Sequence, residues 1–308
     1  MDLIKIKFVD FFLGFIQTDN GIYTLLSKFY NLEISDEPDF VFYSCWGNTH
    51  LTYSCTKIFV TGENVRPNFF HCDYALGFDF LDRENYLRLP LYVYWKDFKP
   101  DDLVFPKYNR VIENNPKTKF CCFVVSNSVS KHRIEFFKKL TTYKQVDSGG
   151  KVLNTISGPI SNKLDFMRPY RFMIAFENSS FPGYVTEKIY ECFFTNTIPI
   201  YWGSDRIEAD FNPQRILNRM DYESDESLID RIIYLEKNEI AYLDFIRQPV
   251  FVNNIISTYF DVDRIRIFFD MIFSGSKETQ VRGIRKQIGT LLRKKRNFEI
   301  KFLKPKFR

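Results

Sequence analysis

The 308-residue sequence lacks the short motifs that assign an enzyme to several large classes. It contains no GxGxxG, P-loop, GxSxG or HExxH pattern, which argues against dinucleotide-dependent, P-loop, serine-hydrolase and zincin chemistry. Its histidines are only three and scattered (His50, His71 and His132), and its six cysteines include no CxxC pair. No metal-ligand spacing is present. We therefore expect no metal or other cofactor, and free thiols in a reducing compartment.

Long apolar runs are missing as well. No stretch of about 20 apolar residues occurs, which is the length needed to cross a bilayer. The apolar N-terminal stretch is interrupted by Lys5, Lys7 and Asp10, so we expect a β-strand there rather than a signal peptide. The sequence predicts a chain that does not span a membrane, and a cytoplasmic location.

Aromatic residues are abundant. They make up 18% of the chain, with 34 Phe and 18 Tyr. Most of them must be buried, because aromatic burial contributes much of the free energy of folding. The length exceeds one ordinary core and fits two domains of roughly 120–150 residues each.

Positive charge is concentrated at the C-terminal end. Residues 282–308 hold eleven Lys or Arg and one acid, whereas the whole chain has a net charge of only +5. The remaining body is mildly acidic, which argues against a nucleic-acid-binding protein. Within this tail, residues 283–296 place apolar residues on one helical face among cations, a pattern typical of helices on an anionic membrane surface. A solvated basic tail is the alternative.

Alternating strand and helix patterns predict an α/β fold. In the first half we expect four strands (4–9, 40–44, 58–61 and 74–78) and a helix near 22–29. The stretch 99–119 is rich in Pro, Asn, Lys and Asp and predicts a linker.

A second α/β series follows, and helical periodicity dominates from residue 223 onward. Its strands are expected at 120–125, 172–176 and 198–202, with helices at 131–140 and 187–194. We predict domains at 1–117 and 118–275, then a basic amphipathic tail at 276–308.

The segment 172–203 has the pattern strand, loop, helix, strand. The loop 177–184 is therefore expected at the carboxyl end of a parallel strand, where open α/β sheets bind ligands. Thr186 is a suitable helix N-cap, and Glu187 in the first turn suits the helix dipole. Lys188 opposes that dipole unless an anion lies beside it, and a diphosphate would be such an anion. A solvated Lys188 is the alternative.

The same segment contains Phe-Glu-Asn-Ser, Gly-Tyr-Val-Thr-Glu-Lys and Ile-Pro-Ile-Tyr-Trp-Gly, spread over 176–203. This pattern resembles the signature of the α1,3/4-fucosyltransferases, glycosyltransferase family 10, which use GDP-fucose. Thr-Gly-Glu-Asn at 61–64, Asp-Tyr-Ala-Leu-Gly-Phe-Asp at 73–79 and Val-Ser-Asn at 125–127 are similar to bacterial members. The resemblance covers about residues 55–215.

The resemblance implies a GT-B architecture, in which two Rossmann-like domains face a cleft and C-terminal helices follow. It implies inverting transfer of L-fucose from GDP-β-L-fucose to the 3-hydroxyl of GlcNAc or Glc in a β-galactosyl-containing glycan, such as a lipopolysaccharide O-antigen. Glu63 matches the general base, with a solvated turn carboxylate as the alternative. Lys188 would neutralise the diphosphate. The implied donor-binding residues are completed by Glu187, Tyr184, Asn178, Arg133, Ser126, Asn127 and Lys151.

One position departs from the bacterial pattern. Related sequences carry Gly-Gly-x-Val-Arg-Asn, whereas here Leu153 takes the place of the Arg and a cation remains only at Lys151. Lysine does not replace the bidentate contacts of arginine. Two other interpretations stay open: a GT-B transferase that uses another sugar nucleotide such as GDP-mannose, and an inactive glycan-binding protein. The expected partners are GDP-fucose, an oligosaccharide or glycolipid acceptor, and an anionic membrane surface contacted through the tail.

Overall fold

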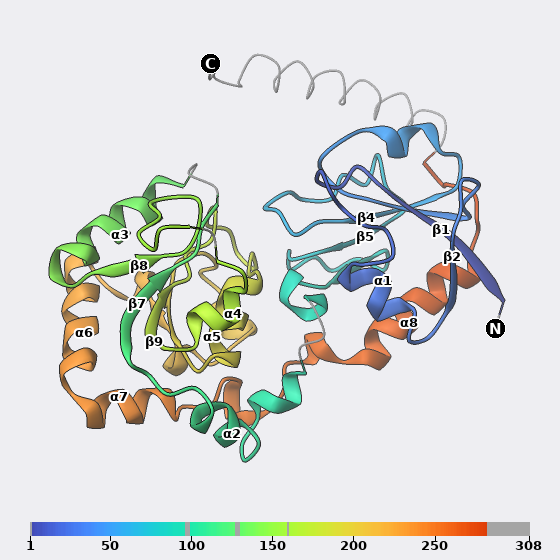
Figure 1. Cartoon of the computed structure of the whole chain (residues 1–308). Helices are drawn as coiled ribbons and strands as arrows, with labels where there is room; N and C mark the ends of the chain where they lie inside the picture. Colours follow the sequence, from blue (N-terminus) through green and yellow to red (C-terminus); the bar gives the residue numbers. More distant parts are fainter. Residues whose placement is uncertain (1, 96–98, 127–129, 159, 282–308) are drawn as a thin grey trace, which may run out of the picture. The chain divides into compact units, whose positions relative to one another are not determined.

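Figure 1 shows the computed structural model, which describes residues 2–95, 99–126, 130–158 and 160–281. The chain forms two compact units. Among the described residues, the first unit consists of those up to Gly77, Leu81–Leu89 and those from Val262 to Val281, and the second consists of Phe78–Phe80 and those from Pro90 to Asp261. Each unit is built on a parallel β-sheet.

The first unit has a six-stranded sheet in the order β2-β1-β3-β4-β5-β6. Helix α8 covers one face of it, since Phe273 of α8 meets Phe40 with ring centroids 4.9 Å apart. The strands are β1 (Leu3–Val9), β2 (Asn31–Ile34), β3 (Phe40–Tyr43), β4 (Thr56–Val60), β5 (Tyr74–Gly77) and β6 (Tyr86–Arg88), and the helices are α1 (Gly21–Leu26) and α8 (Val262–Ser274).

The second unit has a five-stranded sheet in the order β11-β10-β9-β7-β8. One face packs against helices α3 and α6 through a cluster that includes Phe137, Phe172 and Ile232. Helix α5 contributes Ile189 and Phe193 to a separate buried cluster. The strands are β7 (Lys119–Phe123), β8 (Val146–Ser148), β9 (Tyr170–Ile174), β10 (Ile198–Tyr201) and β11 (Leu217–Asn218), and the helices are α2 (Tyr108–Glu113), α3 (Lys131–Tyr143), α4 (Lys163–Met167), α5 (Glu187–Phe194), α6 (Asp225–Lys237) and α7 (Glu239–Ile246).

The two sheets repeat one connection pattern. In each, the second strand of the unit lies on one side of the first and the third strand lies on the other side, giving the order 2-1-3-4-5 over five strands. The direction in which successive strands are added to the sheet therefore reverses between β1 and β3 in the first unit and between β7 and β9 in the second. Open α/β sheets bind ligands at the carboxyl ends of the strands at such a switch point.

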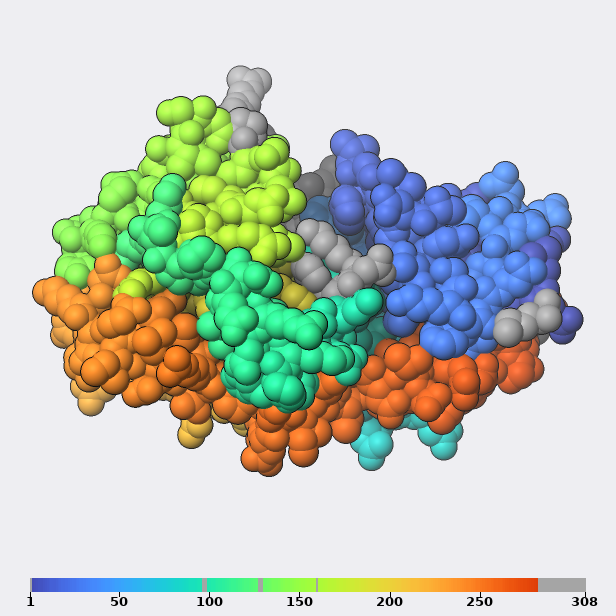
Figure 2. Space-filling view, turned by 60° about the horizontal axis from the view of Figure 1, so that its bottom comes forward, coloured from blue at the N-terminus to red at the C-terminus, as the bar shows by residue number. Residues whose placement is uncertain are grey.

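The predicted α/β fold is confirmed, and the structure adds elements that the sequence did not indicate. The short strands β2, β6, β8 and β11 lack a long apolar run. The linker predicted at 99–119 is wrong: it contains α2 and the start of β7, and Leu103 and Tyr108 are fully buried in the second unit. In the space-filling view this segment forms a continuous part of its unit's surface (Figure 2).

The observed units also differ from the predicted boundaries at residues 117 and 275. The chain passes from the first unit to the second after Leu89 rather than at residue 117, and α8 belongs to the first unit rather than to the second. Packing of Phe269 and Phe273 on the first sheet is the physical reason. Of the predicted basic tail, only 276–281 lies within the described residues, where Thr56 N donates to Lys277 O at 3.0 Å.

All six cysteines are free. Within the described parts of the chain, no helix has the length and apolar character required to cross a bilayer.

Candidate active site

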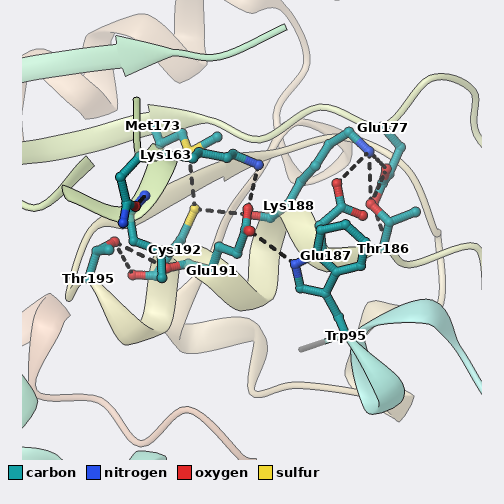
Figure 3. Close-up of polar contacts among 12 residues, drawn as sticks. Trp95, Lys163, Met173, Glu177, Thr186, Glu187, Lys188, Glu191, Cys192 and Thr195 are labelled. Atoms are coloured by element: carbon teal, nitrogen blue, oxygen red, sulfur yellow. Dashed lines mark hydrogen bonds and ion pairs between the residues drawn. The ribbon is translucent and has the colours of Figure 1, made fainter. Parts of the chain in front are cut away.

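A buried carboxylate organises the carboxyl edge of the second sheet. Glu177 lies just beyond β9 and is fully buried. Its Oε1 accepts hydrogen bonds from the backbone N of Thr186 at 2.7 Å and from Thr186 Oγ1 at 2.8 Å, and its Oε2 accepts one from Lys188 Nζ at 3.0 Å. The loop after β9 is thereby tied to the first turn of α5 (Figure 3).

Thr186 takes the N-cap position of α5, as expected, but its side chain does not cap the helix. The hydroxyl instead donates to Glu177 and accepts from Lys188 Nζ at 2.9 Å. Thr186 therefore links a buried anion to a cation.

Lys188 is held in this cluster with only 16% of its side chain exposed. Its Nζ lies 3.7 Å from a carboxylate oxygen of Glu187 in addition to its bond with Glu177. Burial alone would lower the pKa of Lys188, but the two carboxylates outweigh it and raise the pKa above its ordinary value. Burial would likewise raise the pKa of Glu187, and Lys188 and Lys163 hold it below its ordinary value instead. Both groups are charged at neutral pH.

This geometry corrects one step of the sequence argument. A cation in the first turn of α5 does not by itself require a bound diphosphate, because Glu177 already provides a negative partner. The alternative of a solvated Lys188 is also wrong, since the side chain is mostly buried. The ammonium is oriented by the protein before any ligand arrives, and such preorganised charge is what stabilises a developing anion effectively.

A second ion pair lies one helical turn further along α5. Lys163 of α4 pairs with Glu191, whose side chain is 1% exposed, and Trp95 Nε1 donates to Glu191 Oε1 at 3.0 Å. Figure 3 shows Trp95 and Lys163 approaching Glu191 from different segments of the unit. This pair fixes α5 against α4 and against the segment before α2.

Arg133 connects the two sides of the switch point. Arg133 lies in the first turn of α3, the helix that follows β7, and it is 1% exposed. Its Nη2 donates to Oδ1 of Asn178, which follows β9, at 2.7 Å. The Arg133 side chain is therefore buried at the sheet edge rather than exposed on the helix surface. Burial lowers the pKa of its guanidinium, and Glu177 opposes that shift.

The other predicted donor residues lie in several environments. Tyr184 is 2% exposed and packs against Phe78 with ring centroids 5.0 Å apart. Ser126 is exposed at the carboxyl end of β7, and Lys151 is exposed in the loop after β8. Asn127 lies outside the described residues.

The loop that carries Lys151 approaches the end of β7 closely. Val152 N donates to Val125 O at 3.0 Å, and a Cβ at Gly150 would meet that same oxygen at 2.1 Å, so only glycine fits. Leu153, which departs from the family pattern, adopts a left-handed φ of 52° and is 37% exposed. The loop therefore lies at the same edge of the sheet as Ser126. Leu153, the apolar residue that departs from the family pattern, is partly exposed to solvent.

The predicted base, Glu63, belongs to the first unit. It follows β4 in a turn, where its backbone N donates to Thr61 Oγ1 at 3.0 Å. Thr61 is buried, and Glu63 is partly exposed. The carboxylate is therefore accessible at the carboxyl edge of the first sheet.

Sequence reasoning missed Glu177, Glu191 and Lys163. Glu177 lies inside the recognised Phe-Glu-Asn-Ser pattern, and its position at the end of an apolar strand was the available signal. No local signal pairs Lys163 with Glu191, because they meet only in the tertiary structure. Among the described residues, no group of three or more His, Cys, Asp or Glu side chains is arranged to hold a metal ion.

The charges at this edge would suit a compact anion. Arg133 and Lys188 bring two cations to the sheet edge beside the N-terminus of α5, where the helix dipole favours negative charge. Glu177 and Glu187 balance these cations within the protein. A diphosphate group has the charge and the hydrogen-bond acceptors that suit such an arrangement.

Comparison with known proteins gives a consistent result. Residues 6–95 match the alpha-(1,3)-fucosyltransferase FucT N-terminal domain, and residues 114–251 match the C-terminal domain of glycosyltransferase family 10 (fucosyltransferase). The alpha-(1,3)-fucosyltransferase FucT of Helicobacter pylori is 36% identical over 262 residues, covering 73% of this chain and 55% of that protein. The chain thus spans about half the length of this curated relative.

Solved structures agree with the sequence matches. A crystal structure of an alpha1,3-fucosyltransferase is similar with a TM-score of 0.76 and 29% identity, covering 92% of this chain and 93% of that one. An alpha1,3-fucosyltransferase with GDP-fucose gives a TM-score of 0.71 and 30% identity, covering 88% and 90%. The predicted GT-B fold is confirmed by these likenesses, and the chain belongs to the fucosyltransferases of glycosyltransferase family 10.

Proposed function

We propose that this protein is an inverting α1,3-fucosyltransferase that uses GDP-β-L-fucose. The observation that carries the proposal is the preorganised Lys188 ammonium at the N-terminus of α5, held by Glu177 and Glu187 in a family 10 chain. The α1,3-fucosyltransferases with GDP-fucose and with GDP among the similar structures support the choice of donor.

The leaving group is the demanding part of this reaction. When the bond between fucose and diphosphate breaks, negative charge grows on the diphosphate oxygen. Lys188 and Arg133 would oppose that charge, and they would do so at little reorganisation cost because both are already fixed by hydrogen bonds. Glu187 would accept hydrogen bonds from ribose hydroxyls, and Ser126, Asn127 and Lys151 would contribute from the neighbouring loops.

The attacking hydroxyl needs a base. In a direct displacement, Glu63 would take the proton of the acceptor 3-hydroxyl while the oxygen attacks the anomeric carbon opposite the diphosphate. One C–O bond forms as the other breaks, so the β-linked donor yields an α-linked product and free GDP. A partly exposed carboxylate in a turn has the access that this role requires.

The acceptor is proposed to be GlcNAc or Glc within a β-galactosyl-containing glycan of the lipopolysaccharide or Lewis type. Attachment to an anionic membrane surface through 282–308 remains a prediction about residues outside the described ones. The names of the relatives include both 3-alpha-L- and 4-alpha-L-fucosyltransferases. They therefore support transfer of fucose as the reaction class more strongly than they support one acceptor hydroxyl.

A donor screen tests the proposal. Release of GDP is measured with GDP-fucose and with GDP-mannose, each with and without N-acetyllactosamine. We expect acceptor-dependent release with GDP-fucose alone. Stronger turnover with GDP-mannose would support a different transferase. Binding of the glycan without any turnover would instead support an inactive glycan-binding protein.

A further inference from the structure

The carboxyl edge of the first sheet carries exposed apolar side chains at its switch point. Trp46 follows β3 and is 59% exposed. Phe12 and Leu13, in the loop after β1, are 55% and fully exposed. The two loops that carry them adjoin, since Trp46 N donates to Asp10 O, and exposed apolar groups gathered on adjoining loops are typical of a binding surface.

The backbone beneath these side chains is fixed by an unusual contact. Trp46 N donates to Asp10 O at 3.0 Å, which joins the loop after β3 to the end of β1. Asp10 has a left-handed φ of 60°, which is strained for a residue other than glycine. A Cβ at Gly47 would lie 2.3 Å from Asp10 Oδ1, so the close approach needs glycine there.

The Asp10 side chain completes this connection. Its carboxylate, 2% exposed, accepts hydrogen bonds from Thr49 N at 2.8 Å, from His50 N at 2.9 Å and from His50 Nδ1 at 2.7 Å. Burial would raise the pKa of Asp10, but these bonds outweigh it and hold the pKa below its ordinary value. The His50 ring is stacked on Tyr43 with centroids 3.7 Å apart. We call Asp10 and His50 the clamp.

A small cavity lies against the segment that carries Trp46, since Cys45 and Gly47 on either side of Trp46 line it. It has a volume of about 30 Å³, which is room for one water molecule or one hydroxyl group. Asn48, Arg66 and Asn68 are among its lining residues. Cys45, which also lines it, contacts Thr61 Oγ1 at 3.7 Å, and that same oxygen accepts the bond from Glu63 N.

We propose that Trp46 is a binding platform for the acceptor glycan, on which the apolar C–H face of a neutral pyranose ring stacks, and that the clamp of Asp10 and His50 is the positioning device for it. This inference rests on the proposed fucosyltransferase function and identifies the acceptor side of that site. Sugar rings combine an apolar face with hydroxyl groups, so they suit a surface that places an indole beside amide and guanidinium donors.

Two features favour a sugar over a lipid surface as the occupant. Asn48, Arg66 and Asn68 line the cavity beneath the Trp46 segment, and amide and guanidinium groups can hydrogen-bond the hydroxyls of a sugar. The clamp also fixes the backbone at 46–50 through several hydrogen bonds, which lowers the entropy cost of binding a ligand with defined geometry. Membrane insertion of Trp46 and Leu13 is kept as an outcome of the test.

The test compares Trp46→Ala and Trp46→Tyr with the wild-type chain. We expect Trp46→Ala to raise the KM for N-acetyllactosamine about tenfold, with kcat at saturating acceptor and the KM for GDP-fucose nearly unchanged. Trp46→Tyr should recover most of the loss because it keeps an aromatic face. Asp10→Asn should raise the acceptor KM in the same way, and a His50→Gln variant checks this if Asp10→Asn fails to fold.

Phe70→Ala is the matched control, since Phe70 is an aromatic residue of the same unit with 43% exposure and lines a different cavity. It should leave the acceptor KM unchanged. The inference is overturned if Trp46→Ala keeps a normal acceptor KM, or if it lowers liposome binding and leaves catalysis intact. GDP release at saturating N-acetyllactosamine separates the two proposals: normal release in every variant supports the donor site even if the Trp46 platform fails, and its absence from wild type counts against the proposed function.

Discussion

The two units of this protein use the same sheet order to present very different surfaces. At the switch point of the second sheet, Arg133, Glu177 and Lys188 form a mostly buried network of charges. At the switch point of the first sheet, one buried pair, Asp10 and His50, joins the loop after β1 to the loop that carries exposed Trp46, and the partly exposed Glu63 follows β4 at the same edge. The strand order is shared, whereas the chemistry at the strand ends is not.

The difference follows from what each edge is proposed to bind. A diphosphate carries charge that must be matched by fixed cations, so the second unit supplies balanced ion pairs in place of water. A glycan is neutral and needs an apolar face, a few polar contacts and a base. One topology thus provides two ligand positions, and side chains decide the ligand. Substitutions at the first edge should therefore change acceptor use, and substitutions at the second edge should change donor use.

The largest effect is expected at the proposed base in the first unit. Glu63→Gln removes proton acceptance without changing side-chain size, and kcat should fall by about 10²–10⁴-fold. Isothermal titration should show unchanged affinity for GDP, because the donor groups are on the other unit. Glu33→Gln, an exposed carboxylate in β2, serves as the control and should keep full activity. A Glu63→Gln enzyme with normal kcat would assign the base elsewhere.

Replacing Lys188, the cation of the second unit, should weaken the use of GDP-fucose. Lys188→Met should lower kcat/KM for GDP-fucose by about 10²–10³-fold, because the leaving diphosphate loses its positive partner. The KM for acceptor should change little. Lys139→Met removes an exposed lysine with its own ion pairs and is the matched control. Equal losses in both variants would contradict a specific role for Lys188.

Substituting Glu177 tests whether its buried carboxylate organises the charge network around Lys188. Glu177→Gln leaves Lys188 without its closest counter-charge, and the free energy of unfolding should fall by about 3 kcal/mol in urea denaturation. The double variant Glu177→Gln/Lys188→Met should lose less free energy of unfolding than the two single variants lose together, because neither charge is then left without its partner. Strict additivity would show that the two side chains do not interact.

The smallest effect is expected from pH. The pKa of Glu187 is held below its ordinary 4.5, so any stability it contributes is lost only as pH falls through that lowered value. The pKa of Lys188 is raised above 10.5, so its contribution is lost only as pH rises beyond it. Burial raises the pKa of Glu177, which bonds Lys188, so the flat range starts at neutral pH: the KM for GDP-fucose should vary less than about twofold between about pH 7 and pH 8.5. A steep change near neutrality, measured by initial rates, would contradict these charge states.

Local sequence patterns predicted the elements that surround the sites, and the reason is visible in their residues. Strands such as β9 and β10 are continuous apolar runs, and the helix from Glu187 follows directly from a recognisable loop. The short strands β2 and β8 were missed because their stability comes from pairing with neighbouring strands. The composition of residues 99–119 predicts a linker because Leu103 and Tyr108, the residues that anchor this segment in the core, are sparse among polar residues.

The sites show the same limit. Lys188 and Glu187 were found through a pattern of adjacent residues, but the role of Glu177 required knowing that its carboxylate reaches 11 positions along the chain to Lys188. Asp10 and His50 are 40 positions apart, and nothing local indicates that they meet. Contacts made by tertiary packing were therefore the part of the site that sequence patterns could not supply.

The most direct test of the central claim is the structure of the reaction product. N-acetyllactosamine and GDP-β-L-fucose are incubated with the full chain, and the anomeric configuration and linkage of the product are determined by NMR. The account predicts one α-linked fucose on the 3-hydroxyl of GlcNAc and one GDP released per transfer. A β-linked product, a linkage to another position, or no fucosylated product at all would contradict it.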